Sequence, residues 1–375
     1  MVERILKNTI SDKLFKGKAI ILLGARQTGK TTLLKSLFNN ADDAILFNAD
    51  DADVRSLFTN ASSSRLKAVF GKKKIVIVDE AQRIANVGLS FKLITDQIPE
   101  IQLIATGSSS FELSNSVQEP LTGRKWEYKL FPLSFAEMVA HHGLLEEKRM
   151  LPQRLIYGCY PEIISNPGNE RELLHQLTDS FLYKDLLMLD NIKKPEKIVQ
   201  LLQALAFQIG NEVSYSELGR MIEMDKQTVE KYIVLLEKAF VIFRLGAFSR
   251  NLRKEIKHSR KIYFCDNGIR NALIAQFGQI ELRSDIGALW ENYLISERFK
   301  WISYSGIWSN QYFWRTFDNQ EIDYIEESDG LISAFEFKWN SKAKAKSQKL
   351  FKEQYPNNSL KIINKDNFEE YLLHK

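Results

Sequence analysis

Near its start the chain reads Gly24-Ala25-Arg26-Gln27-Thr28-Gly29-Lys30-Thr31, a complete GxxxxGK[ST] phosphate-binding loop. The apolar run of residues 19–23 precedes this loop, and a helical stretch that starts at Thr32 follows it. Strand, loop and helix in this order form the context that the motif needs. The glycines let backbone N–H groups turn toward phosphates, and the helix adds the positive end of its dipole. The loop therefore predicts that the chain binds a nucleotide.

Two side chains of this loop have distinct expected roles. Lys30 is expected to reach the β- and γ-phosphates of ATP, and the Thr31 hydroxyl is expected to bind Mg²⁺. The residues expected to contact the nucleotide are those of the loop and the residue after it: Gly24, Ala25, Arg26, Gln27, Thr28, Gly29, Lys30, Thr31 and Thr32.

A second motif follows downstream, where the β-branched run of residues 75–78 ends in Asp79 and Glu80. Such a run predicts a buried parallel strand with acids at its carboxyl end. Asp79 is expected to hold Mg²⁺ through water, and Glu80 is expected to orient or deprotonate the attacking water. An apolar strand followed by two acids is common, so its position after a phosphate-binding loop is what makes the motif specific.

Residues 101–106 read as a third strand, and Gly107-Ser108-Ser109-Ser110 follows its last residue, Thr106. Thr106 or Ser108 is expected to sense the γ-phosphate of ATP, and the alternative is an ordinary Gly/Ser turn. The strand-like runs 44–48 and 125–130 complete an alternation of strands and helices. This alternation predicts a doubly wound α/β fold with a parallel sheet, which binds its ligand at the carboxyl ends of the strands.

Arg124 stands in the loop before the last of these strands. An arginine there is expected to supply positive charge to the transition state of phosphoryl transfer, either in its own chain or in a neighbouring subunit. The alternative is a solvated surface arginine.

Composition places few limits on function. The chain has 375 residues, more than one typical domain, and 52 Lys and Arg against 47 Asp and Glu give a formal charge of +5. This charge permits contact with nucleic acid without requiring it. The only two cysteines, Cys159 and Cys265, predict neither a disulfide framework nor a zinc site. Without a signal peptide or an apolar run of ~18 residues, we expect a cytoplasmic protein with no membrane contact.

Residues 151–195 are rich in helical patterns and read as a connector or lid, and residues 196–270 read as a winged helix-turn-helix. Two short helices are expected at 214–222 and 225–237, with Ser214 and Asp225 as their capping residues. Helical spacing on the second helix buries Val229, Tyr232, Ile233 and Leu236 and exposes Lys226, Gln227, Glu230 and Lys231.

A basic hairpin follows these helices, between strand-like residues 241–245 and 261–265. This hairpin is the expected wing, and DNA is the expected partner of its cations. Those cations are Arg250, Arg253, Lys254, Lys257, His258 and Arg260. Winged helices also dock proteins, so a protein partner is the alternative.

Residues 271–375 contain two short strands, 321–325 and 333–339, which read as a hairpin. Glu336 and Lys338 are two residues apart and therefore share one face of a strand, with Asp323 on the strand before. This arrangement resembles the PD-(D/E)xK nuclease superfamily. The resemblance implies that Asp323 and Glu336 bind Mg²⁺ and that Lys338 positions a water for phosphodiester cleavage, with Glu291 of the helix at 287–294 as a further acid. The alternatives are a salt-bridged strand face or a nuclease-like domain that only binds.

Across nearly its whole length the chain resembles bacterial and archaeal AAA-type ATPases that carry a C-terminal region of nuclease-like fold. Further matching pieces are Phe131-Pro132-Leu133-Ser134-Phe135-Ala136-Glu137 and Gly158-Cys159-Tyr160-Pro161-Glu162, where the family commonly has glycine in place of Cys159. The resemblance implies an ATPase domain at 1–150, a connector at 151–195, a winged helix at 196–270 and a PD-(D/E)xK-like α/β domain at 271–375. It also implies a homo-oligomer.

Two functions follow from these expectations. In the first, ATP hydrolysis is coupled to DNA binding and to metal-dependent cleavage by the C-terminal domain. In the second, the chain is a nucleotide-switched regulatory or protein-interaction ATPase whose nuclease-like domain does not cleave.

Overall fold

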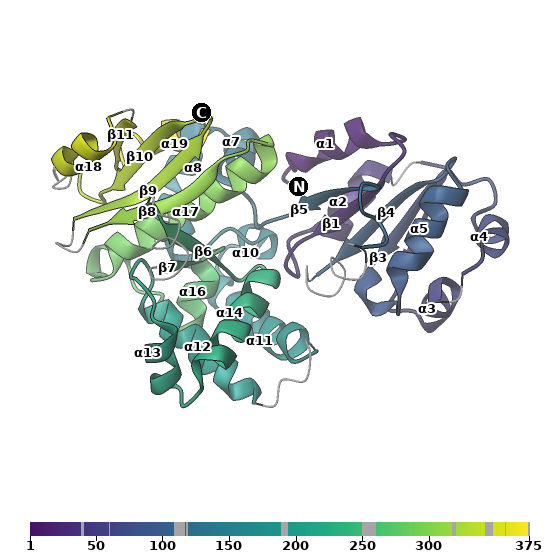
Figure 1. Ribbon diagram of the computed structural model, residues 1–375, viewed down its shortest axis with the longest axis horizontal. Helices are drawn as coiled ribbons and strands as arrows, with labels where there is room; N and C mark the ends of the chain where they lie inside the picture. The colour runs from purple at the N-terminus through teal and green to yellow at the C-terminus, as the bar shows by residue number, and fades with distance from the viewer. Residues whose placement is uncertain are drawn as a thin grey trace. The chain divides into compact units, whose positions relative to one another are not determined.

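The computed structural model of the chain describes residues 1–38, 41–59, 61–108, 117, 119–188, 194–249, 260–316, 320–341, 348–356 and 358–373 (Figure 1). The chain folds into two compact units. The first contains Met1–Pro132, Tyr183–Ile192 and Lys238–Phe240. The second contains Leu133–Leu182, Lys193–Glu237 and Val241–Lys375.

The first unit is built on a five-stranded sheet in the order β2-β3-β4-β1-β5, in which all neighbouring strands are parallel. This sheet confirms the predicted parallel α/β architecture. Its strands are β1 (Ala19–Leu23), β2 (Ala44–Asn48), β3 (Ile75–Asp79), β4 (Gln102–Gly107) and β5 (Lys125–Lys129). Its helices are α1 (Leu6–Lys13), α2 (Lys30–Phe38), α3 (Ala52–Thr59), α4 (Ser63–Phe70), α5 (Val87–Gln97) and the 3-10 turn η1 (Ala81–Arg83).

The three central strands explain why the predicted motifs converge. Every residue of β1, β3 and β4 is buried, as expected for apolar strands covered on both faces, whereas β2 and β5 at the edges are only partly buried. Since the three are neighbouring parallel strands, their carboxyl ends lie at one edge of the sheet. That edge carries the phosphate-binding loop, Asp79 and Thr106.

The second unit contains a six-stranded mixed sheet in the order β11-β10-β9-β8-β6-β7. Its strands are β6 (Ile242–Ala247), β7 (Arg260–Phe264), β8 (Asn310–Arg315), β9 (Glu321–Ser328), β10 (Leu331–Phe337) and β11 (Asn358–Ile363). The two strands of the expected wing, β6 and β7, therefore belong to the same sheet as the expected nuclease-like hairpin, β9 and β10. This sheet joins residues from both sides of the expected domain boundary at 270.

The helices of the chain after Pro132 are α7 (Phe135–His142), α8 (Leu144–Arg149), α9 (Leu151–Tyr157), α10 (Pro161–Ser165), α11 (Glu170–Met188), α12 (Pro195–Phe207), α13 (Tyr215–Met221), α14 (Lys226–Lys238), α16 (Asn267–Leu273), η3 (Ile280–Leu282), α17 (Ile286–Ser305), α18 (Gln348–Gln354) and α19 (Phe368–Leu373). Aromatic side chains fix several of them on the sheet. On one face Trp290 of α17 packs edge to face on Phe368 of α19, and on the other Trp314 of β8 packs on Phe351 of α18.

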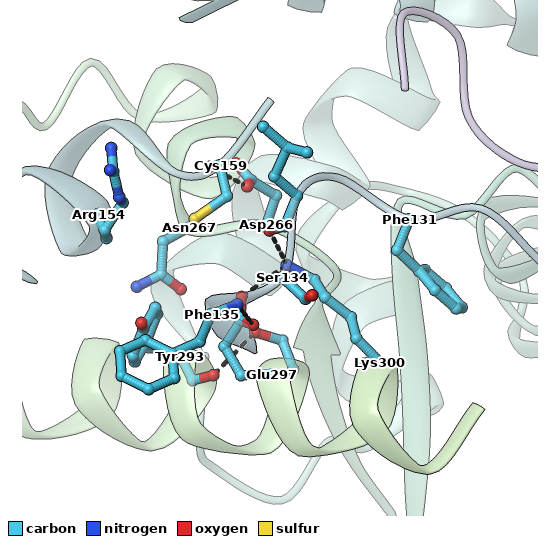
Figure 2. Close-up of polar contacts among 12 residues, drawn as sticks. Phe131, Ser134, Phe135, Arg154, Cys159, Asp266, Asn267, Tyr293, Glu297 and Lys300 are labelled. Carbon is cyan, nitrogen blue, oxygen red and sulfur yellow. Dashed lines mark hydrogen bonds and ion pairs between the residues drawn. The ribbon is translucent and has the colours of Figure 1, made fainter. Parts of the chain in front are cut away.

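A buried polar network holds α17 in the second unit (Figure 2). The Phe135 N–H donates to Glu297 Oε2 at 2.7 Å, and Lys300 Nζ donates to Glu297 Oε1 at 2.6 Å. The Cys159 N–H donates to Asp266 Oδ2 at 2.7 Å. Burial raises the pKa of the Glu297 and Asp266 carboxyl groups, because low-dielectric surroundings disfavour their charged forms. The network therefore ties the segment after Pro132 to the helix that also carries Glu291.

Within the part of the chain that the structure describes, no helix has both the length and the apolar character needed to cross a bilayer.

Candidate functional site

The phosphate-binding loop is closed tightly around its own lysine. Lys30 Nζ donates to the carbonyl oxygens of Gly24 and Ala25 at 2.8 and 2.9 Å and is buried. Gly24 must be glycine, because a Cβ atom there would lie 2.2 Å from the Leu130 carbonyl oxygen. Gly29 has a φ of +92°, a backbone conformation that L side chains rarely adopt. At both glycines of the motif, a residue with a Cβ would therefore clash or be strained.

The predicted magnesium ligands lie together at the edge of the sheet. The Thr31 hydroxyl donates to Asp79 Oδ2 at 2.7 Å, and the Thr106 hydroxyl donates to Asp79 Oδ1. Asp79 and Thr106 are both buried. The structure therefore brings Thr106 to Asp79, where a side chain that responds to the γ-phosphate of ATP is expected.

Glu80 follows Asp79 in the left-handed backbone conformation, with a φ of +52°. Its N–H donates to Thr106 Oγ1 at 3.3 Å, and its side chain is held by an amide that the sequence reasoning did not single out. Gln82 Nε2 donates to Glu80 Oε2 at 2.6 Å and to Ser108 Oγ at 3.0 Å. The left-handed turn at Glu80, which cannot be read from residue type, is what brings Gln82 back to the acid.

The donors at this edge fit Mg²⁺. A hydroxyl and a carboxylate are hard oxygen ligands, and Mg²⁺ is usually held by one or two carboxylates together with substrate phosphates and water. Thr31 and Asp79 supply that small set. When bound, the ion neutralises charge on the phosphate oxygens.

Arg124 lies away from this site. Its carbonyl oxygen accepts from Ala19 N at 3.0 Å, which places it beside the amino end of β1, whereas the phosphate-binding loop follows the carboxyl end. Its guanidinium Nε donates to Asp96 Oδ1 at 2.6 Å. The expectation that Arg124 acts on the nucleotide of its own chain is therefore wrong, because the length of β1 separates the two. Action on a neighbouring subunit stays a prediction.

The predicted residues of the C-terminal hairpin come together on β9 and β10. The antiparallel pairing of these strands ends at Phe335 and Tyr324, and beyond it Asp323 Oδ2 accepts from the Phe337 N–H at 2.7 Å. Lys338 Nζ lies 3.9 Å from Asp323 Oδ2 and 3.6 Å from Glu336 Oε2. Phe335 and Phe337 face the aromatic core, as their alternation with Glu336 and Lys338 predicts.

Glu291 enters this cluster together with a lysine that sequence reasoning missed. Lys261 Nζ of β7 lies 3.0 Å from Glu291 Oε1 and also contacts Glu321 Oε1 of β9. Tyr263, two residues along β7, donates its hydroxyl to Glu291 Oε1 at 2.6 Å. Lys261 alternates with Tyr263 along β7, so both side chains lie on the same face of the strand.

The surroundings of Asp323 oppose its charged form. Burial is the largest cause and the nearby Glu291 carboxylate adds to it, and together they raise the pKa of Asp323 to about 7 although Lys261 and Lys338 favour ionisation. Burial lowers the pKa of Lys261, but the neighbouring carboxylates of Glu291, Glu321 and Asp323 outweigh it, so the pKa of Lys261 is raised.

The predicted metal set of Glu291, Asp323 and Glu336 does not fit a divalent cation. Among the residues that the structure describes, no group of three or more His, Cys, Asp or Glu side chains is arranged to hold a metal ion. The ammonium groups of Lys261 and Lys338 lie among these acids instead.

The two helices expected in the middle of the chain are present, with the predicted caps. Ser214 Oγ accepts from Glu217 N, and Asp225 Oδ1 accepts from Thr228 N. Gly219 allows the tight turn between α13 and α14, since a Cβ there would lie 2.4 Å from the Met224 carbonyl oxygen. On α14 the expected buried and exposed faces are both confirmed.

Arg260, at the start of β7, donates to the Tyr215 hydroxyl and lies 3.7 Å from Glu230. The other cations of the expected wing, Arg250, Arg253, Lys254, Lys257 and His258, lie outside the described residues.

Three family models match the chain. Residues 16–139 match an AAA domain, residues 148–280 match a domain of unknown function (DUF8612), and residues 286–372 match a domain of unknown function (DUF4143).

Related proteins align with most of the chain at low sequence identity. An uncharacterized protein of Mycobacterium tuberculosis is 25% identical over 333 residues, which are 88% of this chain and 72% of that protein. An uncharacterized protein of Methanocaldococcus jannaschii is 25% identical over 285 residues, 70% of this chain and 64% of that protein. Among solved structures, the Walker-type ATPase of Pyrococcus abyssi has 16% identity and a TM-score of 0.51, covering 73% of this chain and 96% of that one. The match of residues 16–139 to an AAA domain, together with the fold shared with a Walker-type ATPase, supports ATP binding and hydrolysis by the N-terminal part of the chain.

Proposed function

We propose that the chain hydrolyses ATP in its first unit with Mg²⁺ and couples this turnover to DNA binding by its second unit. The convergence of Thr31, Asp79 and Thr106 within hydrogen-bonding distance at the end of the phosphate-binding loop carries the ATPase part of the proposal. Lys30 exchanges the carbonyl oxygens of Gly24 and Ala25 for phosphate oxygens when ATP binds. Glu80 accepts a proton from the attacking water.

Turnover measurements on two variants test this assignment. Lys30→Ala is expected to abolish ATP binding, because it removes the cation that the loop encloses. Glu80→Gln is expected to keep binding and lower turnover by about 10²–10⁴-fold, the contribution of a positioned general base. ATP binding at wild-type affinity in Lys30→Ala, or wild-type turnover in Glu80→Gln, contradicts the proposal.

Support for DNA binding comes from the exposed start of α14. Lys226, Gln227 and Lys231 are exposed there, while the opposite face of the helix packs in the core. A helix that follows a tight turn and presents long polar side chains is the element that helix-turn-helix proteins place in the major groove.

The DNA part is tested by anisotropy of a fluorescent duplex at several salt concentrations. Lys226→Glu with Lys231→Glu is expected to weaken binding and to reduce the slope of log affinity against log salt by about 1 for each lost phosphate contact. Lys72→Glu, an exposed lysine of the first unit, is the matched control. Equal affinity for the double variant and the control excludes α14 as the contact.

A second candidate function is phosphodiester cleavage, which the juxtaposition of Asp323, Glu336 and Lys338 favours. Against it stands the absence of a fitting divalent-cation site among the described residues. Incubation of the protein with plasmid DNA and Mg²⁺ distinguishes a cleaving from a non-cleaving C-terminal domain. Nicking that disappears in Lys338→Ala supports a nuclease. ATP turnover without nicking supports the non-cleaving alternative.

Arg124 bears on assembly. We propose that it serves the ATP site of a second copy of the chain, because its place at the amino end of β1 takes it away from its own site. Mixing Arg124→Ala with Lys30→Ala chains is then expected to restore part of the turnover that each lacks alone. Mixtures no more active than the sum of the parts contradict both the role and the homo-oligomer.

A further inference from the structure

Lys261 is a buried cation of the second unit, whereas the ATP site belongs to the first. Its side chain is 1% exposed, and it extends from β7 past the ring of Phe313, whose centroid lies 5.4 Å from Nζ. At its end Nζ meets Glu291 of α17 at 3.0 Å and Glu321 of β9. Removing an ammonium from water is costly unless it is paired, so these two carboxylates are what keep it in the interior.

The remaining acids of the cluster also have partners from the chain. The Tyr263 hydroxyl donates to Glu291, and Arg315 Nη1 lies 3.8 Å from Glu321 Oε2. Lys338 lies 3.6 Å from Glu336 and 3.9 Å from Asp323, which also accepts the Phe337 N–H. Each carboxylate that a metal ion would need is therefore engaged by a cation, a hydroxyl or an amide of the protein itself.

A divalent cation requires these oxygens to converge on one point. Mg²⁺ requires oxygen ligands in near-octahedral geometry at about 2.1 Å. Ca²⁺ takes roughly six to eight oxygen ligands at about 2.3–2.6 Å. An ammonium in contact with Glu291 and Glu321 prevents that convergence, because a second positive charge at the same carboxylates is repelled and has fewer oxygens to bind. We propose that Lys261 is the resident cation of this acidic cluster and keeps it closed to divalent metal ions.

Removal of the Lys261 ammonium should then uncover a metal site. Without it, Glu291, Glu321 and Asp323 lose their shared counter-ion and become a cluster of hard oxygen ligands. The same reasoning predicts that metal-dependent cleavage is absent while Lys261 is in place. The inference goes beyond the proposed ATPase and does not depend on ATP turnover or on DNA binding.

The experiment is titration of Mn²⁺ into the full-length chain without nucleotide, followed by the electron paramagnetic resonance signal of free Mn²⁺. All chains carry Asp79→Asn, so that the ATP site lacks its carboxylate ligand for the metal ion. Lys261→Met removes the ammonium, and Lys261→Arg keeps a cation at the same place. Lys300→Met is the matched control, because Lys300 is an equally buried lysine that pairs with Glu297 of the same helix and with none of the acids that Lys261 contacts (Figure 2).

The expected result is one Mn²⁺ bound per chain in Lys261→Met, with an affinity at least about tenfold above that of the parent, and no gain in Lys261→Arg or Lys300→Met. Absence of this gain in a folded Lys261→Met chain overturns the proposal. So does a Mn²⁺ site in the parent that Asp323→Asn removes.

If Lys261→Met is too unstable for the Mn²⁺ titration, thermal unfolding with and without Mn²⁺ tests the same proposal. Millimolar Mn²⁺ is then expected to raise the unfolding midpoint of Lys261→Met but not that of Lys300→Met, because binding stabilises only the state that holds the ion. Equal midpoints of Lys261→Met with and without Mn²⁺ overturn the proposal.

Discussion

Gln82 is the residue that fixes the side chain of Glu80 in the ATP site. Its amide nitrogen lies 2.6 Å from Glu80 Oε2 and 3.0 Å from Ser108 Oγ. Replacing Gln82 by alanine frees the carboxylate to rotate, and small misplacements of a catalytic group are costly. We expect kcat for ATP hydrolysis to fall about tenfold in Gln82→Ala and KM to change little, since Gln82 is not one of the residues predicted to contact phosphate.

Steady-state kinetics measure both constants. Gln97→Ala, an exposed glutamine at the end of α5, is the control and should behave as wild type. A wild-type kcat in Gln82→Ala would mean that the backbone alone positions Glu80.

Asp323 makes stability depend on pH in the neutral range. Its pKa is raised from 3.8 to about 7 in the folded chain, so the folded state binds more protons than the unfolded state between these values. The contribution of Asp323 to the free energy of unfolding is therefore fully present below pH 4, and it is lost as pH rises through 7. We expect the free energy of unfolding of the second unit to fall across this window and Asp323→Asn to flatten the fall.

Urea unfolding at a series of pH values measures this effect. The control is Asp329→Asn at an exposed turn, where asparagine tolerates the φ of +52° that Asp329 has. A fall with pH that is equally steep in Asp323→Asn and in the control would assign the pH dependence to other groups.

At the scale of elements, the turn between α9 and α10 shows why one of its motif residues is glycine. Gly158 has a φ of +72°, and a Cβ there would lie 1.9 Å from Asp266 Oδ1. The Asp266 carboxylate also caps α16 through the N–H groups of Gly268 and Ile269, so it cannot move away cheaply. We expect Gly158→Ala to destabilise the second unit by about 4 kcal/mol or to prevent its folding.

Gly306→Ala separates the backbone effect from the steric one. Gly306 ends α17 with a φ of +65° and has nothing within 4 Å of the added Cβ, so only the left-handed conformation is penalised, by about 1 kcal/mol. Denaturant unfolding compares the two variants. Equal losses would show that Asp266 yields to the methyl group.

The elements could be predicted from the sequence where one local pattern decides them. The apolar strands β1, β3 and β4 and the amphipathic helix α14 follow from hydrophobic periodicity, and Asp323, Glu336 and Lys338 follow from alternation along two strands. Lys261 could not be predicted in the same way. Its pairing with Glu291 and Glu321 arises because β7, β9 and α17 meet in one unit, and no local pattern records that β6 and β7 extend the sheet of the C-terminal hairpin. Likewise, Arg124 looks catalytic until the pairing of β1 with β5 puts it at the wrong edge.

At the scale of the whole molecule, the first unit includes a short segment more than a hundred residues beyond Pro132 in the sequence. Residues Lys238–Phe240 belong to the unit that begins at Met1, and the ring of Phe240 packs edge to face on Phe131 with centroids 6.1 Å apart. Phe131 is itself held at its carbonyl oxygen by Arg4, which also binds the Thr28 carbonyl oxygen of the phosphate-binding loop. A fragment of residues 1–150, which the sequence delimits as the ATPase, lacks this contribution.

The contribution of Phe240 can be measured in the intact chain. Phe240 is 7% exposed, and truncating a buried phenylalanine to alanine costs about 3 kcal/mol or more. We expect Phe240→Ala to lower the unfolding midpoint of the first unit and to weaken ATP binding, although position 240 lies far along the chain from the loop. The first unit is recognised as the transition that ATP raises in a Glu80→Gln background, since a ligand stabilises only the part that binds it.

Phe243→Ala is the matched control for this last prediction. Phe243 lies three residues further on but belongs to the second unit, where its ring stacks on Phe299 with centroids 4.6 Å apart. Loss of the Phe243 ring should lower the midpoint of the unfolding transition that ATP does not raise. It should leave ATP affinity unchanged. If Phe240→Ala instead behaves as Phe243→Ala does, residues 238–240 contribute nothing to the stability of the first unit. The fragment 1–150 would then hydrolyse ATP as well as the full chain does.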